Sequence, residues 1–396
     1  MIRSSLAAAL SLALLAPSAL VAEPFTPTPV EAQQLILLSK PAADFIARLK
    51  GPRETVDGQT LDPKLQFVLE QTRPFATAEA AAREQAAFKT PAGRAAFRAA
   101  GERRWLLTSK VTAPMRTVTD RNIPSRGGAL AVRVYRPQTG DDAPLPVLVY
   151  FHGGGWIFGS IEAVDRSVSL IANEAKVIVV SVAYRLAPEH PYPAASDDGE
   201  DAYAWAKAHA AEFGGDAANI AVGGDSAGGH VAVNISQRLA AQRQPAPTMQ
   251  LLYYPAVDLS GDYRSYELFG EGYGLDKAFA DFVRPTVFGS RDLADGQVSP
   301  LKAKSLKGLP ATILTTGGFD ILRDSNRRFA RRLEADGVAV TFLSYPSLNH
   351  SFLQQSGVIE EADRAAVETA RLFGTAVRSR ATLLASENRS AAAPKR

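Results

Sequence analysis

The chain of 396 residues is 46% hydrophobic and 21% charged, which is an ordinary globular composition with enough length for one large core and an accessory domain. It has no cysteine, which excludes disulfides, thiolate metal sites and a cysteine nucleophile. The formal net charge is only +3, and no basic cluster with interleaved aromatic residues occurs, so a nucleic-acid partner is not expected.

Residues 1–22 are typical of a secretory signal peptide. A short basic start precedes an apolar run from Leu6 to Ala16, which Pro17 ends. This run is too short to span a bilayer, and small residues follow it up to Ala22. We expect cleavage after Ala22 and a periplasmic or secreted protein with no stable membrane span. The alternatives are a buried N-terminal helix and an uncleaved anchor.

Residues 23–110 are expected to form a linker followed by helices. The proline-spaced stretch from residue 23 to residue 30 favours an extended start. Asp62-Pro63, followed by apolar residues at helical spacing, predicts a helix start. The alanine-rich stretch 77–104 predicts one or two helices, interrupted near 91–93, and no strand signals occur in 31–109. These helices either cover an active site or form a peripheral bundle that only adds stability.

Residues 111–380 have the pattern of a doubly wound α/β sheet. Alternating stretches at 115–119 and 130–135 predict two half-buried strands joined by a turn at 126–128. Continuous apolar runs at 147–151 and 177–182 predict parallel strands that are buried on both faces. The other expected strands are 220–222, 249–253, 312–315 and 338–343, and the expected helices are 162–175, 196–212, 226–243, 324–336 and 360–377. This alternation predicts a mostly parallel sheet with helices on both sides.

Two further stretches do not follow the alternation. Residues 258–298 are rich in glycine, tyrosine and aspartate, with a helix expected near 276–288, and are interpreted as an insertion. Its aromatic residues either line an apolar pocket or form the core of the insertion; they are Tyr266, Phe269, Tyr273, Phe279 and Phe282. The composition of residues 381–396 predicts a disordered tail.

A Gly-x-Ser-x-Gly pattern lies at Gly224-Asp225-Ser226-Ala227-Gly228, between a short apolar strand and the start of a helix. A serine on such a sharp turn needs small neighbours two residues away on either side, and the turn exposes its hydroxyl. The amide of Ala227 would lie at the helix N-terminus, where it can stabilise negative charge. Alone, the pattern is equally typical of a turn that merely needs glycines.

A serine hydroxyl is a weak nucleophile, so Ser226 needs a base, and the base needs an orienting acid. Where this pattern carries a nucleophile, the chain order is serine, acid, histidine. Of five histidines, only His230 and His350 follow Ser226. His230 lies one helical turn beyond Ser226 and is expected to be a packing or surface residue. His350 follows the last predicted strand, at the sheet end where such folds place their chemistry, and is the expected base.

The acid is expected on the loop that follows strand 312–315, the strand before the one that leads to His350. Asp320 lies there, and Asp324 is the competitor. Because Asp324 is near the start of the next helix, its carboxylate can instead cap free N–H groups, so we favour Asp320. Asp225 and Asp197-Asp198 are interpreted as turn and helix-start residues rather than catalytic ones.

Oxyanion donors are expected from the loop His152-Gly153-Gly154-Gly155-Trp156, which directly follows the strand 147–151. Glycines let the main chain approach a substrate carbonyl and direct N–H groups at it. We expect Gly153, Gly154, Gly155 and Ala227 to form the oxyanion hole. The alternative is a plain glycine turn. We disfavour it, because a nucleophile pattern follows further along the chain.

Together these pieces resemble the hormone-sensitive-lipase-like (bacterial family IV) carboxylesterases of the α/β-hydrolase superfamily. The matching motifs cover about residues 115–375; they are His152–Trp156, Tyr184–Ala195, Gly224–Gly229, Val298–Leu301, Asp320–Asp324 and His350–Phe352. The resemblance implies an α/β-hydrolase fold, a catalytic triad of Ser226, Asp320 and His350, and a cap made of the N-terminal helices and the insertion. It also implies that His152 and residues 184–195 brace loops around the site. The chain departs from the family in its long N-terminal extension and signal peptide.

The implied activity is hydrolysis of short- to medium-chain carboxylic esters by two-step acyl transfer, which needs no metal or organic cofactor. The expected partner is a small-molecule ester substrate, and a homodimer is left open. Lipase, amidase and deacetylase variants remain alternatives, because the same triad serves them all and specificity lies in the pocket and cap. A different alternative is a non-catalytic protein that binds small molecules on a hydrolase scaffold.

Overall fold

The computed structural model describes residues 25–261 and 263–392, so the predicted signal peptide lies outside the described residues. The central sheet has eight strands in the order β10-β9-β8-β7-β5-β6-β4-β3. They are β3 Thr117–Ser125, β4 Gly128–Arg136, β5 Leu145–Phe151, β6 Ile178–Val182, β7 Gly215–Asp225, β8 Met249–Tyr253, β9 Ala311–Phe319 and β10 Val340–Asn349. β4 is antiparallel to both its neighbours, and all other pairs are parallel. The predicted mostly parallel α/β sheet is confirmed.

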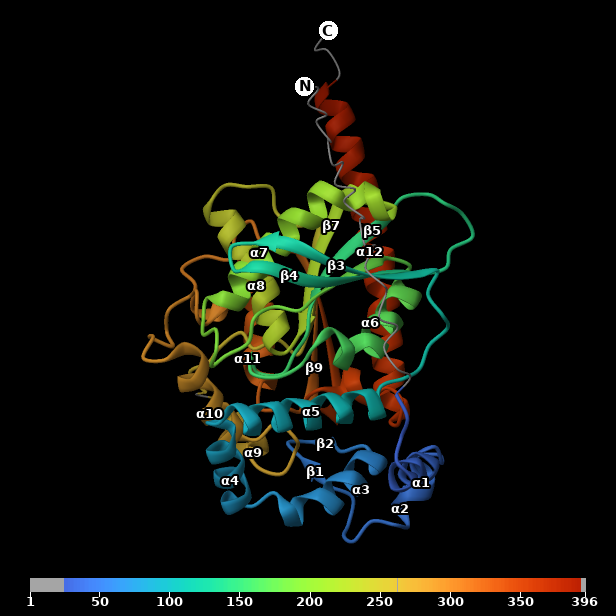
Figure 1. Cartoon of the computed structure of the whole chain (residues 1–396), viewed down its shortest axis with the longest axis vertical. Helices are drawn as coiled ribbons and strands as arrows, with labels where there is room; N and C mark the ends of the chain where they lie inside the picture. The colour runs from blue at the N-terminus through green and yellow to red at the C-terminus, as the bar shows by residue number, and fades with distance from the viewer. Residues whose placement is uncertain (1–24, 262, 393–396) are drawn as a thin grey trace, which may run out of the picture.

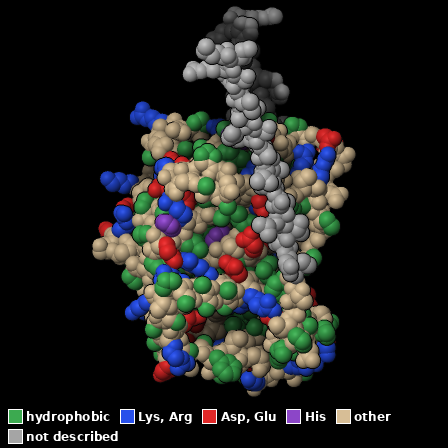
Figure 2. Space-filling model, in the orientation of Figure 1, with side chains coloured by type: hydrophobic (Ala, Val, Ile, Leu, Met, Phe, Trp, Pro, Cys, Tyr) green, Lys and Arg blue, Asp and Glu red, His purple; other side chains and the backbone are tan. Residues whose placement is uncertain are grey.

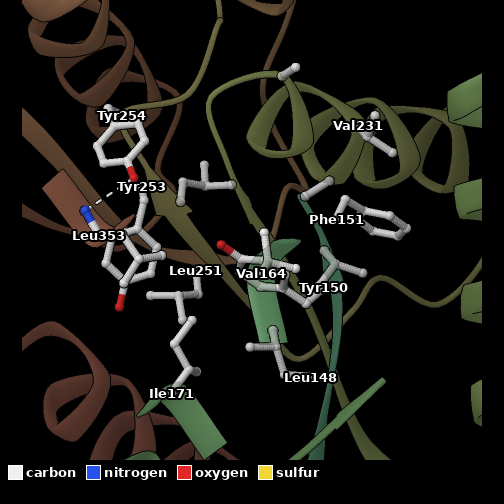
Figure 3. Packing of buried hydrophobic residues seen from close by; sticks show 14 of the residues in the cluster. Leu148, Tyr150, Phe151, Val164, Ile171, Val231, Leu251, Tyr253, Tyr254 and Leu353 are labelled. Carbon is white, nitrogen blue, oxygen red and sulfur yellow. Dashed lines mark hydrogen bonds between the residues drawn. The ribbon is translucent and has the colours of Figure 1, made fainter. Parts of the chain in front are cut away.

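Helices cover both faces of this sheet, as Figure 1 shows. α6 (Ile161–Ala175) and α12 (Glu360–Ala392) lie on one face, and α7 (Ala194–His209), α8 (Ala227–Ala241) and α11 (Arg323–Ala335) lie on the other. Every residue of β5 is buried, because successive side chains point to opposite faces and both faces are covered. In Figure 3, Leu148 of β5 points toward Val164 and Ile171 of α6, whereas Phe151 points toward Val231 of α8.

Several strands are longer than the hydrophobic patterns predicted. β3 was expected at 115–119 but continues to Ser125, because its backbone pairs with β4 residue by residue up to the turn, through polar residues 120–122. β7 was expected at 220–222 and spans Gly215–Asp225. β10 was expected at 338–343 and ends at Asn349. These extensions place Ser226 and His350 directly after the ends of their strands.

The N-terminal region differs from the sequence expectation at two points. The extended linker predicted for the start of residues 23–40 gives way to helix α1 (Pro29–Leu38), because Thr28 and Glu31 form a reciprocal capping box and Pro29 suits the first helical turn. A short hairpin, β1 (Thr55–Val56) with β2 (Gln59–Thr60), occurs where no strand was predicted. Two residues per strand are too few to give an alternating pattern.

The other helices of this layer follow the predicted pattern. α2 (Ala43–Ile46) and α3 (Pro63–Thr72) precede α4 (Ala78–Phe88) and α5 (Pro91–Thr108). The stretch 77–104 therefore forms two helices, and the break falls just before Pro91, where the Thr90 side chain caps α5. The insertion supplies α9 (Arg264–Phe269) and α10 (Lys277–Phe288). The tail predicted to be disordered from residue 381 differs, because α12 continues to Ala392.

These N-terminal and insertion helices lie together at the carboxyl ends of the parallel strands (Figure 1). The Asp62 amide donates to the Ser347 carbonyl of β10 over 2.9 Å, and the rings of Phe88 (α4) and Phe282 (α10) meet edge to face at 5.4 Å. Figure 2 shows acidic and basic side chains mixed over the visible face. Within residues 25–261 and 263–392, no helix is long and apolar enough to cross a membrane.

Candidate active site

Four loops carry the predicted functional residues, and each begins at the carboxyl end of a parallel strand. β5 leads into Gly153–Gly155, β7 into Ser226, β9 into Asp320 and β10 into His350. Because parallel strands end at the same edge of a sheet, the order β10-β9-β8-β7-β5 brings these four loops together.

Ser226 lies on a turn with a strained backbone. Its φ is 52° and its ψ is −115°, outside the regions that residues with side chains normally adopt. The flanking glycines are required by close approach: a methyl group on Gly228 would lie 1.8 Å from the Phe151 carbonyl oxygen, and one on Gly224 would lie 2.4 Å from the same atom. The Ser226 amide donates to the Tyr253 carbonyl over 2.9 Å and anchors the turn to β8.

The structure joins Ser226, His350 and Asp320 in one chain of hydrogen bonds. His350 Nε2 lies 2.9 Å from Ser226 Oγ, and His350 Nδ1 lies 2.7 Å from Asp320 Oδ2. The other Asp320 oxygen accepts from the Leu322 amide over 2.8 Å. With Asp320 Oδ2 as the acceptor, Nδ1 is the donor that carries the ring proton, and the unprotonated Nε2 can accept the proton of the serine. His350 is 6% exposed and Asp320 1%, so solvent barely reaches this pair.

Asp324, the competing acid, has different partners. Its Oδ2 accepts from the Ser265 amide over 2.9 Å, and its Oδ1 accepts from Arg323 Nε over 2.8 Å. Asp324 therefore ties the start of α11 to α9 of the insertion, and it is Asp320 that contacts His350.

The loop around His350 is fixed by several contacts. Gln355 Nε2 donates to Asn349 Oδ1 and to the His350 carbonyl, over 3.0 and 3.1 Å. The Tyr254 ring packs on the imidazole with centroids 4.8 Å apart, and its hydroxyl accepts from the Leu353 amide, as the dashed line in Figure 3 marks. The imidazole is thus held between the nucleophile and the acid.

The glycine loop divides into one supporting amide and two unpaired ones. The Gly153 amide donates to Asp225 Oδ1 over 3.0 Å, so it already has an acceptor and is set apart from the other expected oxyanion donors. The amides of Gly154, Gly155 and Ala227 have no protein acceptor within the described part of the chain. Gly154 and Gly155 have φ values of 99° and 59°, a backbone conformation that favours glycine.

Asp225 is a supporting residue that sequence reasoning assigned only to a turn. It is completely buried and accepts three hydrogen bonds, from the Tyr150 hydroxyl (2.7 Å), the Gly153 amide (3.0 Å) and Gln354 Nε2 (3.0 Å). Burial raises the pKa of its carboxyl, and the three donors act in the opposite direction. Its position at the end of a buried strand was the available signal, because a buried carboxylate must find donors.

Two histidines near the site are buried and take part in packing. His152 is buried against the Tyr184 ring at 4.3 Å, with Nδ1 2.8 Å from the Gly153 carbonyl, and burial lowers its pKa to about 4. His230 is buried against the Trp156 ring, with Nε2 3.0 Å from the Val298 carbonyl oxygen, and burial lowers its pKa to about 4 as well. The interpretation of His230 as a packing residue is confirmed.

Comparisons with known proteins agree with this fold. A family described as alpha/beta hydrolase fold matches residues 148–354. The carboxylic ester hydrolase LipN of Mycobacterium tuberculosis is 39% identical over 307 residues, which are 75% of this chain and 78% of LipN. The ethyl acetate hydrolase of Pseudomonas putida is 37% identical over 254 residues, which are 63% of this chain and 80% of that protein.

Solved structures give the same result. The ester hydrolase EH1AB1 from the metagenome of Lake Arreo, in complex with a derivative of bipyridine phosphonate, superposes with a TM-score of 0.72 and 34% identity, over 80% of this chain and 98% of that one. The hyperthermophilic esterase of Pyrobaculum calidifontis superposes with a TM-score of 0.70 and 31% identity, over 80% of this chain and 98% of that one.

Proposed function

Because this chain belongs to the α/β-hydrolase-fold family and is a hormone-sensitive-lipase-like carboxylesterase, we propose that it cleaves esters through Ser226, His350 and Asp320. Its substrates in this proposal are carboxylic esters with short to medium acyl chains. The observation that supports the mechanism best is the continuous hydrogen-bonded path from Asp320 through His350 to Ser226 Oγ. The similarity to the ethyl acetate hydrolase of Pseudomonas putida supports short acyl groups.

In the first half of the reaction, Ser226 Oγ attacks the ester carbonyl carbon while its proton passes to His350 Nε2. Asp320 holds the Nδ1–H and stabilises the imidazolium charge. The amides of Gly154, Gly155 and Ala227 donate to the negative carbonyl oxygen, and each such donor is typically worth ~10²–10³ in turnover. The tetrahedral intermediate collapses, His350 protonates the leaving alcohol, and the acyl group stays on Ser226.

In the second half, water takes the place of the alcohol. His350 Nε2 removes a proton from the water as it attacks the acyl-enzyme carbonyl, and the same amides hold the second oxyanion. Collapse of this intermediate returns the proton to Ser226 Oγ and releases the carboxylic acid. Each step uses only residues of this chain, an ester and water.

The test is turnover of p-nitrophenyl esters by purified residues 23–396, with Ser226→Ala as the matched variant. We expect hydrolysis by the wild type and a loss of about 10⁴-fold or more in kcat for the variant, since removing a triad member leaves only the oxyanion hole and binding. A p-nitrophenyl alkylphosphonate should transfer its phosphonyl group to Ser226 Oγ with loss of p-nitrophenolate, and so add the mass of that group in the wild type and not in the variant. Turnover retained by a folded Ser226→Ala protein would show that another residue is the nucleophile.

We further propose that the protein acts outside the cytoplasm, because residues 1–22 have the basic start, apolar run and small-residue end of a signal peptide. Expression of the full chain in a bacterium, followed by fractionation and N-terminal sequencing, tests this proposal. A mature protein that begins near residue 23 in the periplasm or medium is expected. A cytoplasmic protein that retains Met1 would contradict it.

A further inference from the structure

The residue before the proposed base has a side chain that is held on both sides. Asn349, the last residue of β10, is 3% exposed. Its Nδ2 donates to the Tyr273 carbonyl over 2.7 Å, and its Oδ1 accepts from Gln355 Nε2 over 3.0 Å. Gln355 Nε2 also donates to the His350 carbonyl over 3.1 Å. The Asn349 side chain therefore connects the insertion to the backbone of the base.

Tyr273 lies in the insertion loop, residues 270–276, which joins α9 to α10. This loop approaches β10 closely, since a methyl group on Gly274 would lie 2.8 Å from Asn349 Nδ2. Gly274 has a φ of 104°, a backbone conformation that favours glycine. The Tyr273 ring packs on Phe319, the residue before the proposed acid, with centroids 5.5 Å apart. The insertion loop thus contacts both strands that lead to the base and the acid.

Arg73, directly after α3, holds the insertion loop from the side of the N-terminal helices. Its Nε donates to the Gly272 carbonyl over 2.8 Å, and its guanidinium carbon lies 5.0 Å from the centroid of the Tyr273 ring. Both terminal nitrogens donate to the Glu54 carboxylate, with Nη2 2.9 Å from Oε2. Such a two-pronged pair fixes the plane of the guanidinium. Glu54 therefore orients Arg73, which binds the insertion loop with its remaining nitrogen and with its face.

A base that transfers a proton needs support that the reaction leaves unchanged. His350 is bonded to Ser226 Oγ and Asp320 Oδ2, and the bond to Oγ changes each time the proton moves. The contacts made by Asn349 and Gln355 carry no transferred proton, so they persist through both halves of the reaction. Misplacement of a reacting group by 1 Å can cost ~10²-fold in rate. Groups that fix the backbone of the base should therefore affect the chemical steps.

We propose that Asn349 is a positioning residue for His350 and that Arg73 supports it through the insertion loop. This inference rests on the proposed function, since it needs His350 to act as the base. Among the described residues, the side chains of Asn349 and Arg73 have no hydrogen bond to Ser226 or Asp320, so their effect passes through the His350 loop. Loss of either support should lower kcat and leave KM nearly unchanged.

The first test is hydrolysis of p-nitrophenyl butanoate by Asn349→Ala and Asn349→Leu. Asn349→Ala removes both side-chain bonds, so we expect kcat to fall about 10- to 100-fold, with KM within about twofold of the wild type. Asn349→Leu removes the same bonds but fills the space, and it should lose as much. The rate at which a p-nitrophenyl alkylphosphonate labels Ser226 should fall by the same factor, since this step also needs His350 to take the serine proton.

A double variant separates positioning from a general loss of stability. Arg73→Met alone should lower kcat about three- to tenfold, and it keeps the test usable if the Asn349 variants fail to fold. Because Arg73 acts through the bond that Asn349→Ala has already removed, adding Arg73→Met to Asn349→Ala should lower kcat by less than about twofold further. Arg73→Lys retains the charge and a donor, so it should keep more of kcat than Arg73→Met.

Arg103→Met is the matched control, because Arg103 forms the same kind of pair with Glu31 among the N-terminal helices. Within the described residues, Arg103 has no hydrogen bond or ion pair with the insertion loop. Its replacement should leave kcat within about twofold of the wild type.

Four results would overturn the inference while Ser226-dependent turnover of the wild type still supported the proposed function. They are an unchanged kcat in folded Asn349→Ala, a loss that appears only in KM, single losses that multiply in the double variant, and an equal loss in Arg103→Met. Wild-type protein without Ser226-dependent turnover would instead refute the proposed function.

Discussion

Replacement of Asp320 by asparagine tests the proposed acid at the level of single hydrogen bonds. In the wild type, Asp320 Oδ1 accepts from the Leu322 amide over 2.8 Å, and Oδ2 accepts from His350 Nδ1 over 2.7 Å. An asparagine that keeps the bond to Leu322 must turn its NH₂ group toward His350. The imidazole then carries its proton on Nε2, and it cannot accept the proton of Ser226.

The expected loss is about 10⁴-fold in kcat, which corresponds to about 5 kcal/mol of transition-state stabilisation. Asp324→Asn is the control, because Asp324 is only four residues away but contacts Ser265 and Arg323. Its asparagine oxygen can still accept from the Ser265 amide, so we expect kcat within about threefold of the wild type and a loss of stability of ~1 kcal/mol.

The assay is steady-state hydrolysis of p-nitrophenyl butanoate, with kcat normalised to the fraction of Ser226 that a phosphonate titrates. Thermal unfolding of each variant shows whether a lost rate reflects a lost fold. Equal losses for the two variants, or a larger loss for Asp324→Asn in folded protein, would refute the assignment of Asp320 as the acid.

Two further predictions follow from buried groups. Asp225→Asn places an NH₂ group against either Gln354 or the Gly153 amide, both of which are donors. We therefore expect kcat to fall by about tenfold or more with little change in KM. A folded variant in which only KM rises would contradict this expectation. Burial lowers the pKa of His230 to about 4 from its ordinary value of 6.5, so the unfolded chain binds the proton more readily and stability is lost as the pH falls from 6.5 to 4. The full span corresponds to about 3 kcal/mol, and His230→Leu should remove that part of the pH dependence of urea unfolding; an unchanged slope would show that His230 does not titrate as expected.

The triad could be found from the sequence because few residues compete for each role. Only two histidines follow Ser226, and one of them belongs to the helix that the serine opens. Asp320 and His350 each follow a predicted strand, and the ends of parallel strands meet at one edge of the sheet. Chain order and sheet topology therefore sufficed to choose the three residues that the structure brings together.

The supporting contacts could not be found in the same way, because they depend on which groups face each other across loops. Nothing in the sequence pairs Asp225 with Gln354, 129 residues further on, or separates the Gly153 amide from those of its two neighbours. The short hairpin at 55–60 and the extension of β3 through polar residues are fixed by backbone pairing, which leaves no hydrophobic pattern.

The loop with Gly154 and Gly155 is held from two sides, and this fixes the amides that are proposed to stabilise the oxyanion. On the side of the sheet, Asp225 binds the Gly153 amide. On the side of the helical layer, Arg98 of α5 donates to the Ile157 carbonyl over 2.9 Å, and Phe279 of α10 covers Gly155. Because the amides proposed to stabilise the oxyanion need fixed positions, we expect a substitution that loosens either helix contact to displace these donors and to lower kcat.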